Sequence, residues 1–302
     1  MLETSATEAP AIDRQADEHV IHSWLRAKKK FPHVWCPGCG LGIVLGAAIR
    51  AFEAVGLTKD DLVLVSGIGC TGRIPVYVDA NTLHTTHGRA LTFATGVKLA
   101  KPHLKVVVFM GDGDALAIGG NHFIHAARRN IDLTTIVVNN FIYGMTGGQT
   151  SPTTPHGKYS TTTPYGQFAQ PFDPCELAKS AGATFVARST AAHSLHMQQM
   201  FKQALQHKGF SMVEVISNCP TCYGRLNRLG NSVEMLQDFR EHSVRNKPGL
   251  DVAAAAAEGK RYVIGVLHED DVLPEFIEQK RTVIQNGLNG GKKEAKPNAK
   301  PA

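Results

Sequence analysis

Long hydrophobic runs are missing from this sequence. No apolar stretch approaches the roughly 20 residues that a helix needs to cross a bilayer, so we expect no membrane-spanning segment. The first twenty residues, MLETSATEAPAIDRQADEHV, are polar and partly acidic and lack the basic region and apolar run of a secretory signal. We therefore expect a cytoplasmic protein with no membrane partner, in which residues 1–20 form a flexible arm.

Cysteine is scarce as well, with six residues in a chain of 302. That is too few for a disulfide-stapled scaffold of this size. In a reducing compartment, thiols that gather in the fold serve as metal ligands or redox groups rather than as structural bridges. The cysteines are therefore candidates for a metal or cofactor site.

Positive charge is in modest excess, at a net +6, and part of it lies in the final segment NGGKKEAKPNAKPA. This segment has no periodicity, so we expect residues 286–302 to form a disordered tail. Domains that bind nucleic acids carry basic residues clustered on one face, with aromatic residues between them. The sequence lacks that pattern, and we expect no nucleic-acid partner.

What the chain does contain is a repeated alternation of short apolar runs with helix-like segments. Apolar runs of strand length are found at 61–70, 104–114, 133–140, 184–189 and 211–217. Segments with the apolar spacing of helices are found at 40–55, 89–101, 120–130, 174–182 and 194–206. Apolar strands that alternate with helices predict an α/β fold, with a mostly parallel sheet and helices on both faces. We expect one such domain over residues 21–285.

Residues 141–172 interrupt this alternation with a stretch rich in glycine, threonine, proline and serine. Long irregular segments inside compact domains are usually functional or disordered. This one comes directly after a predicted strand, which is where open α/β sheets bind their ligands. We therefore predict that it forms a loop of the functional site.

Two polar motifs follow neighbouring predicted strands, Gly111-Asp112-Gly113 after one and Asn139-Asn140 after the next. The separation of 28 residues between Asp112 and Asn140 leaves room for a helix and a parallel crossover, which brings both strand ends to one sheet edge. Carboxylate and amide oxygens in incomplete number suit Mg²⁺, which shares its coordination shell with phosphate and water. A lone GDG is a common turn, so the prediction depends on the pair of motifs.

The spacing from GDG to NN resembles the thiamine diphosphate motif, which spans about 30 residues. The resemblance implies that Asp112, Asn140 and the main-chain carbonyl of Ile142 bind Mg²⁺. It also implies that thiamine diphosphate contacts a further set of residues, namely Ile68, Gly69, Cys70, Gly111, Gly113, Asp114, Gly144, Met145 and Thr146.

Four of the cysteines have positions at which they could meet. Cys36 and Cys39, in WCPGCG, precede the first long predicted helix, and Cys70 and Cys219 each follow a predicted strand. Four thiolates suit either a [4Fe–4S] cluster or a tetrahedral zinc ion. Cys175 lies at the start of a predicted helix, where we expect no other cysteine nearby. We therefore expect it to be an ordinary buried cysteine.

Five segments occur in a characteristic order, WCPGCG, SGIGCTGR, HTTHGRALTFATG, GDGDALAIGGNH and NCPTCYGR. Together they closely resemble the β subunit of two-subunit 2-oxoacid:ferredoxin oxidoreductases, over about residues 30–280. The resemblance implies a [4Fe–4S] cluster on Cys36, Cys39, Cys70 and Cys219, with Cys222 as the competitor for the fourth position. A zinc ion bound by the two C-x-x-C pairs would not use Cys70 as a ligand. It would also provide no acceptor for the electrons from thiamine.

The same resemblance implies a reaction and its partners. A 2-oxoacid and CoA would give an acyl-CoA and CO₂, with electrons passing through the cluster to ferredoxin. The expected substrate is 2-oxoglutarate, with pyruvate next. In this family the glutamate that activates thiamine comes from the α subunit, so we expect an αβ or (αβ)₂ assembly and an inactive chain without the partner. A non-oxidative thiamine enzyme with structural zinc, and a non-catalytic module, remain as alternatives.

Several basic side chains near these motifs are candidates for catalysis. Arg73, in SGIGCTGR, could pair with the carboxylate of the substrate through its guanidinium fork, although a surface arginine on a loop is an equally good interpretation. His84 and His87 lie on a loop before a predicted helix, and we prefer His87 for proton handling. His122 and His125 share one helix face, where packing or capping explains both.

Overall fold

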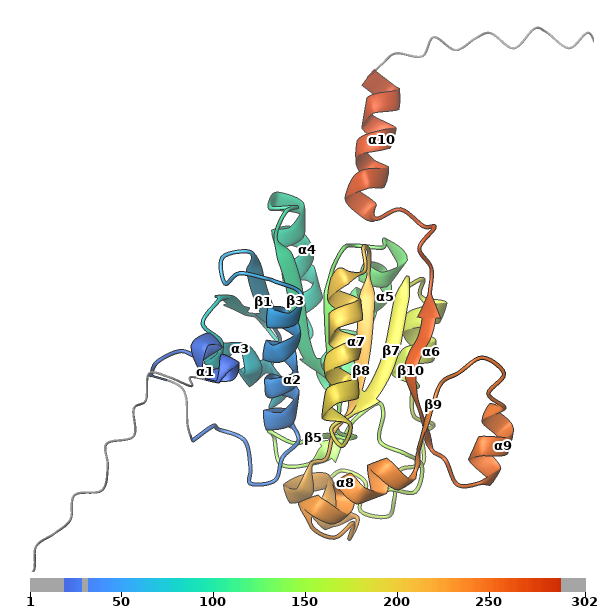
Figure 1. The fold of residues 1–302 in the computed structure, drawn as a ribbon. Helices are drawn as coiled ribbons and strands as arrows, with labels where there is room; N and C mark the ends of the chain where they lie inside the picture. Colours follow the sequence, from blue (N-terminus) through green and yellow to red (C-terminus); the bar gives the residue numbers. More distant parts are fainter. Residues whose placement is uncertain (1–18, 29–31, 289–302) are drawn as a thin grey trace, which may run out of the picture.

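The computed structural model describes residues 19–28 and 32–288. In these residues an eight-stranded sheet carries helices on both faces (Figure 1). In spatial order its strands are β2 (Asn81–His84), β1 (Leu62–Ser66), β3 (Lys105–Gly111), β4 (Thr134–Asn139), β8 (Ser211–Ile216), β7 (Phe185–Thr190), β10 (Tyr262–Glu269) and β9 (Ser243–Arg245). A separate short hairpin consists of β5 (Ile142–Tyr143) and β6 (Gln149–Thr150).

Strands β2, β1, β3, β4, β8 and β7 are all parallel to their neighbours in the sheet. Strand β10 pairs antiparallel with β7, and β9 runs parallel to β10. The predicted mostly parallel α/β fold is therefore confirmed. Strands β1, β3, β4 and β8 are consecutive in the sheet, so their carboxyl ends lie next to one another along one edge.

Helices cover the sheet in two layers. The layer in front of the sheet in Figure 1 contains α1 (Val20–Trp24), α2 (Leu41–Ala54), α3 (Ile74–Tyr77) and α7 (Ser194–Gln206). The opposite layer contains α4 (Ala90–Ala100), α5 (Gly120–Arg128) and α6 (Pro174–Ser180). Helices α8 (Ser232–Glu241), α9 (Val252–Ala257) and α10 (Phe276–Leu288), which we did not predict, belong to the last part of the described chain.

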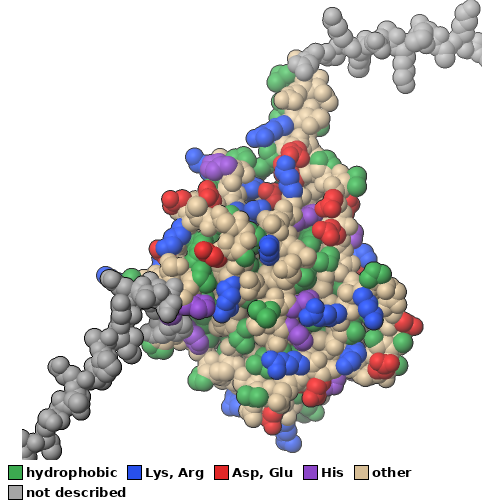
Figure 2. All heavy atoms as spheres, viewed as in Figure 1, with side chains coloured by type: hydrophobic (Ala, Val, Ile, Leu, Met, Phe, Trp, Pro, Cys, Tyr) green, Lys and Arg blue, Asp and Glu red, His purple; other side chains and the backbone are tan. Residues whose placement is uncertain are grey.

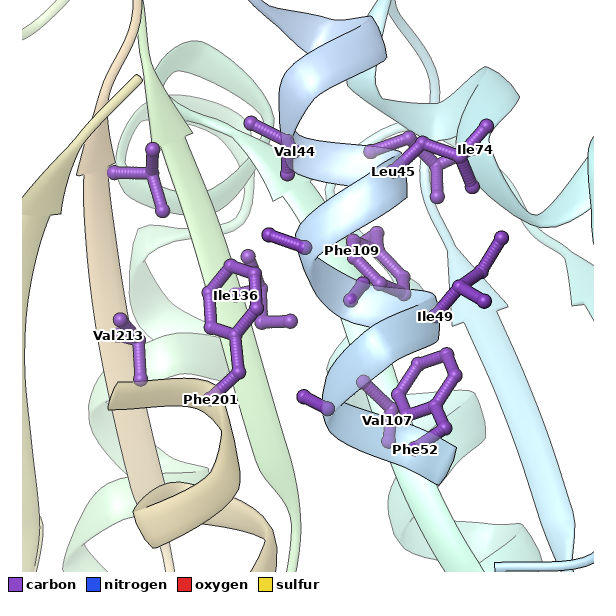
Figure 3. Packing of buried hydrophobic residues seen from close by; sticks show 14 of the residues in the cluster. Val44, Leu45, Ile49, Phe52, Ile74, Val107, Phe109, Ile136, Phe201 and Val213 are labelled. Atoms are coloured by element: carbon purple, nitrogen blue, oxygen red, sulfur yellow. The ribbon is translucent and has the colours of Figure 1, made fainter. Parts of the chain in front are cut away.

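Alternate residues of β3 pack against opposite helical layers. Val107 and Phe109 belong to the same buried cluster as Phe52 of α2 and Phe201 of α7, as Figure 3 shows. Val108 belongs to the cluster on the other face, with residues of α4 and α5. Because both faces are buried, a slip of the strand by one residue would exchange the two sets of side chains. The core therefore fixes where each strand ends at the functional edge.

The predicted arm (1–20) and tail (286–302) lie mostly outside the described residues. Their described ends differ from the expectation, because α1 begins at Val20 and α10 runs to Leu288, so residues 20 and 286–288 are helical.

Helix α10 projects away from the sheet (Figure 1), and basic and acidic side chains are interspersed on the face shown in Figure 2. Within residues 19–28 and 32–288, no helix has the length and apolar character needed to cross a bilayer.

Candidate functional site

Four candidate residues follow four adjacent strands. Cys70 comes after β1, Asp112 after β3, Asn140 after β4 and Cys219 after β8. Parallel strands present their carboxyl ends at one edge, and ligands of open α/β sheets bind there. Two adjoining cavities lie at this edge, one around Asp112 and one around the cysteines. We call them the acidic cavity and the thiol cavity.

The acidic cavity brings together every residue that we assigned to Mg²⁺ or thiamine diphosphate, and also His87. It is lined by Ile68, Gly69, Cys70, Thr71, His87, Gly111, Asp112, Gly113, Asp114, Asn140, Ile142, Tyr143, Gly144, Met145 and Thr146. Of these, only Thr71 and Tyr143 were not singled out from the sequence. The residues lie at or just after the ends of β1, β2, β3 and β4 or belong to the predicted site loop, so the loop does line the site.

Asp112 is a buried carboxylate that forms no ion pair with the described residues. Its side chain is 2% exposed, and in the described part of the chain no basic side chain forms an ion pair with it. Burial raises the pKa of Asp112 to about 6, although hydrogen bonds from Ser151 and Thr153 lower it in part. An ionised carboxylate in such a place is costly unless a positive charge pairs with it. The Asp112 carboxylate therefore fits the role of an oxygen ligand to a hard divalent cation.

Asp114, the second aspartate of GDGD, fixes the wall of the acidic cavity. Its Oδ1 accepts the backbone N–H of Gly88 at 2.7 Å and lies 2.7 Å from Nδ1 of His87. Burial raises the pKa of Asp114, and the Gly88 N–H and the His87 imidazole lower it in part. The imidazole of His87 is thus held at the cavity by a carboxylate, an arrangement that suits proton handling.

Gly113 lies where a side chain would not fit. A Cβ atom there would overlap the ring of Tyr143, whose hydroxyl donates to the Gly113 carbonyl at 3.2 Å. We predict that Gly113→Ala lowers the free energy of unfolding by about 1–3 kcal/mol, because the ring must move. The control is Gly120→Ala on α5, which meets open space and should cost nothing, since alanine favours helix by up to about 1 kcal/mol. Urea denaturation measures both, and equal effects would contradict the prediction.

The thiol cavity contains all four predicted cluster ligands, Cys36, Cys39, Cys70 and Cys219, and also Cys222. Burial, with a smaller contribution from the neighbouring thiols, raises the pKa of Cys39 to about 12 and that of Cys70 to about 11. Such thiols keep their protons until a metal centre replaces them. The cavity therefore has the character of a metal site rather than of a reactive dithiol.

Hydrogen bonds connect the WCPGCG turn (35–40) to two of the strand ends. The indole Nε1 of Trp35 donates to the carbonyl of Cys70 at 2.8 Å. The side-chain amide of Asn218 donates to the carbonyl of Gly38 at 2.8 Å. The turn is thus attached both to the end of β1 and to the segment that carries Cys219, although 180 residues separate Gly38 from Asn218. The meeting of the thiols is a property of the tertiary fold.

No three thiols in the described residues lie as close together as a single zinc ion requires. Tetrahedral ligation with Zn–S bonds near 2.3 Å places the sulfur atoms about 3.8 Å from one another. Within the ranges that the structure describes, no three of these sulfur atoms lie within 4.8 Å of one another. The cavity therefore fits a larger centre, in which each thiolate binds a different iron atom.

The two cavities meet at Gly144. Four residues line both of them, namely Cys70, Asn140, Gly144 and Met145. The thiol of Cys222 donates to the Gly144 carbonyl at 3.5 Å, and a Cβ atom on Gly144 would lie 3.6 Å from Sγ of Cys219. A group bound in the acidic cavity would thus be separated from the thiols by little more than one stretch of backbone.

The remaining basic candidates lie elsewhere. Arg73 lines the thiol cavity and not the acidic cavity, so its contact with a substrate carboxylate stays a prediction. His84 hydrogen-bonds to the hydroxyl of Ser66 at 2.9 Å, and burial lowers its pKa. His122 and His125 lie on α5 and line neither cavity. Of the histidines that we considered, His87 alone lines the acidic cavity.

Several features of the site have no signature in the sequence. A π-helical turn, Asp114–Ile118, follows the GDG motif, and another, Pro220–Gly224, follows Cys219. Such turns are rare and occur frequently at functional sites, but no residue pattern predicts them. Thr153, which touches Asp112, was hidden among the many threonines of the site loop.

Known proteins of the same kind were found by sequence and by structure. Residues 67–215 match the family model described as "Thiamine pyrophosphate enzyme, C-terminal TPP binding domain". The chain is 53% identical over 233 residues to the 2-oxoglutarate synthase subunit KorB of Methanothermobacter marburgensis, covering 77% of this chain and 82% of that protein. It is 48% identical over 256 residues to the subunit of the same name from Methanocaldococcus jannaschii, covering 85% and 94%.

A solved structure agrees with these relatives. It is the 2-oxoglutarate:ferredoxin oxidoreductase from Magnetococcus marinus with 2-oxoglutarate, coenzyme A and succinyl-CoA bound, with a TM-score of 0.79 and 32% identity, and the match covers 95% of this chain and 98% of that one. These matches confirm the predicted thiamine diphosphate-binding fold and the predicted resemblance. The chain therefore belongs to the β subunits of 2-oxoacid:ferredoxin oxidoreductases, among those of the 2-oxoglutarate type.

Proposed function

We propose that this chain, together with an α subunit, converts 2-oxoglutarate and CoA to succinyl-CoA and CO₂ and passes two electrons to ferredoxin. The observation that carries the proposal is the meeting of the acidic and thiol cavities at Gly144. The names of the relatives support 2-oxoglutarate as the substrate, and pyruvate is the alternative.

The acidic cavity would hold Mg²⁺ and thiamine diphosphate. Asp112, the side chain of Asn140 and the carbonyl of Ile142 would bind the metal, and Gly144, Met145 and Thr146 would line the diphosphate. When bound, thiamine diphosphate supplies the electron sink for the decarboxylation of a 2-oxoacid. The protein contributes a buried carboxylate, whose attraction for the cation is strengthened by the low local dielectric constant. His87 would hold or move a proton at its imidazole.

The thiol cavity would hold a [4Fe–4S] cluster on Cys36, Cys39, Cys70 and Cys219. When bound, such a cluster supplies a one-electron acceptor. Cys36 is exposed, Cys39 and Cys70 are partly exposed, and Cys219 is buried. The cavity therefore runs from the edge of the acidic cavity to the surface, where ferredoxin could approach. The expectation of a cytoplasmic protein is part of this proposal, because the cluster needs a reducing compartment.

The acidic cavity lacks one group that thiamine chemistry needs. Among the described residues that line it there is no glutamate to contact the aminopyrimidine ring. The family relation implies that the α subunit supplies this residue. We therefore infer that the site is completed at an αβ interface, in an αβ or (αβ)₂ assembly, and that this chain alone is inactive.

The test is an anaerobic assay of the purified αβ complex with 2-oxoglutarate, CoA and oxidised ferredoxin. We expect ferredoxin reduction that requires both subunits and CoA, and that is faster with 2-oxoglutarate than with pyruvate. Release of CO₂ without reduction of the acceptor would identify a non-oxidative thiamine enzyme and would overturn the proposal. A higher rate with pyruvate would overturn only the choice of substrate.

A further inference from the structure

The turn that follows β4 has a backbone conformation that needs support. Phe141 lies between Asn140 and Ile142 with a φ of 64°, a left-handed value that is rare for a bulky residue. Such a residue keeps this conformation only where its surroundings enforce it. Two hydrogen bonds do so, since Oδ1 of Asn139 accepts the Phe141 N–H at 3.1 Å and the hydroxyl of Thr154 donates to the Phe141 carbonyl at 2.7 Å.

Asn139 is also linked to Asp112, at the end of the neighbouring strand, through Thr153. The Thr153 hydroxyl lies 2.9 Å from Oδ1 of Asn139 and 2.7 Å from Oδ2 of Asp112, so its single proton is shared between two acceptors. One amide oxygen therefore contacts the N–H of the turn that carries Asn140 and also the hydroxyl that touches Asp112. A change in the orientation of this amide would disturb both expected metal ligands together.

The orientation of the Asn139 amide is set by a buried ion pair. Its Nδ2 donates to Oε1 of Glu214 at 2.8 Å, while Oε2 of Glu214 accepts Nε of Arg188 at 2.5 Å. Glu214 is 1% exposed and forms an ion pair with Arg188, and a carboxylate in such a pair only accepts hydrogen bonds. The amide nitrogen must therefore face Glu214, and the amide oxygen must face the turn.

The cluster formed by Asp173, Cys175 and Glu214 is not a metal site of its own. Its ligand atoms lie within 4.8 Å of one another, but Arg188 already supplies the cation, with bonds to both carboxylates. Cys175 is buried, as we expected, with Sγ 3.3 Å from Oε2 of Glu214. The cluster therefore serves to hold Glu214, and through it Asn139.

We propose that Asn139, oriented by Glu214 and Arg188, is a positioning residue for the Mg²⁺ site that Asp112 and the turn of Asn140 would form. Asn139 does not touch the metal in this account. It acts by holding the turn and, through Thr153, the carboxylate. The inference rests on the proposed function, because it takes the acidic cavity to be the Mg²⁺ and thiamine diphosphate site.

The test measures the Mg²⁺ concentration at which thiamine diphosphate binding to the αβ complex is half-maximal, by equilibrium dialysis. Asn139→Ala should raise this concentration about 10- to 100-fold, the usual cost of removing a group that orients a metal ligand. Binding should recover at saturating Mg²⁺. Glu214→Gln keeps the volume of the side chain and should shift the midpoint in the same direction, by about tenfold.

Cys175→Ala is the matched control, because Cys175 contacts the same carboxylate of Glu214 but has no hydrogen bond to Asn139. Its Mg²⁺ midpoint should stay within about twofold of the wild type. A purely structural role for Asn139 and Glu214 would lower the thermal midpoint of the metal-free complex and leave the Mg²⁺ dependence unchanged. That result would overturn the inference, as would failure of both variants to assemble while Cys175→Ala assembles normally.

The same measurement separates this inference from the proposed function. If the wild-type complex binds no thiamine diphosphate in a Mg²⁺-dependent way, the proposed function fails. If the wild type shows that dependence and both Asn139→Ala and Glu214→Gln keep its midpoint, the proposed function stands and the positioning role is wrong.

Discussion

The Cys219→Ser variant of the αβ complex should lose the [4Fe–4S] cluster, whereas Cys222→Ser should keep most of it. Cys219 ends the loop after β8 in the buried part of the thiol cavity, at 9% exposure, and Cys222 is more exposed. After burial, which is the main cause, Cys219 raises the pKa of Cys39 and of Cys70 more than any other thiol does. Cys219 is thus the thiol most strongly coupled to both of these ligands.

The position of Cys222 explains why it should be dispensable. Its thiol already has a hydrogen-bond acceptor in the expected diphosphate loop, the carbonyl of Gly144 at 3.5 Å. Absorption near 400 nm, which is about where [4Fe–4S] clusters absorb, and iron analysis after anaerobic purification would measure the outcome. Loss of the cluster in Cys222→Ser alone would show that our choice of the fourth ligand is wrong.

Replacing Asp112 by asparagine should abolish the Mg²⁺-dependent binding of thiamine diphosphate and reduce the activity of the complex about 10³-fold or more. The loss of a ligand charge removes several kcal/mol of metal affinity, and each 1.4 kcal/mol corresponds to about tenfold. Asparagine is nearly isosteric with aspartate and can keep a hydrogen bond to Thr153, so the fold should be retained.

The same variant should make the metal-free chain more stable above pH 6. Burial raises the pKa of Asp112 to about 6, whereas an unfolded aspartate ionises near pH 4. Between these values the folded state binds the extra proton, so the stability of the wild type falls as the pH rises through that window. Above pH 6 the buried Asp112 is ionised, which lowers the free energy of unfolding of the wild type by at most about 3 kcal/mol. Asparagine does not ionise, so the variant does not lose this stability.

Thermal unfolding of the metal-free protein at pH 5 and pH 8 measures this effect. Asp112→Asn should gain stability over the wild type at pH 8 and much less at pH 5. Asp60→Asn, at an exposed position, is the control and should change little at either pH. An equal loss of stability at both pH values in Asp112→Asn would show that ionisation of the buried Asp112 does not destabilise the folded protein.

The carboxyl ends of the strands explain why so much of the site could be predicted. Parallel strands that alternate with helices must present these ends at one edge, whatever their order in the sheet. The position of Cys70, Asp112, Asn140 and Cys219, each after an apolar run, therefore predicts that they share this edge. The structure adds that β1, β3, β4 and β8 are consecutive, which places the thiols and the acidic residues in adjoining cavities.

Other parts of the molecule depend on contacts that local patterns do not encode. Strand β10 pairs antiparallel with β7, and no motif in the sequence of this strand predicts its direction. Glu214 belongs to an apolar strand, and only the tertiary fold reveals that Arg188 and Asn139 satisfy it. The predicted boundaries at residues 20 and 286 differ from the ends of the helices, because α1 begins at Val20 and α10 runs to Leu288.

Iron, sulfide and thiamine analysis of the anaerobically purified αβ complex tests the central claim most directly, namely that the two adjoining cavities hold a cluster and thiamine diphosphate. We predict about four iron ions, four sulfide ions and one thiamine diphosphate per β chain, with visible absorption that bleaches when 2-oxoglutarate and CoA are added. Zinc without iron in the thiol cavity, or a cluster that 2-oxoglutarate does not reduce, would contradict the account.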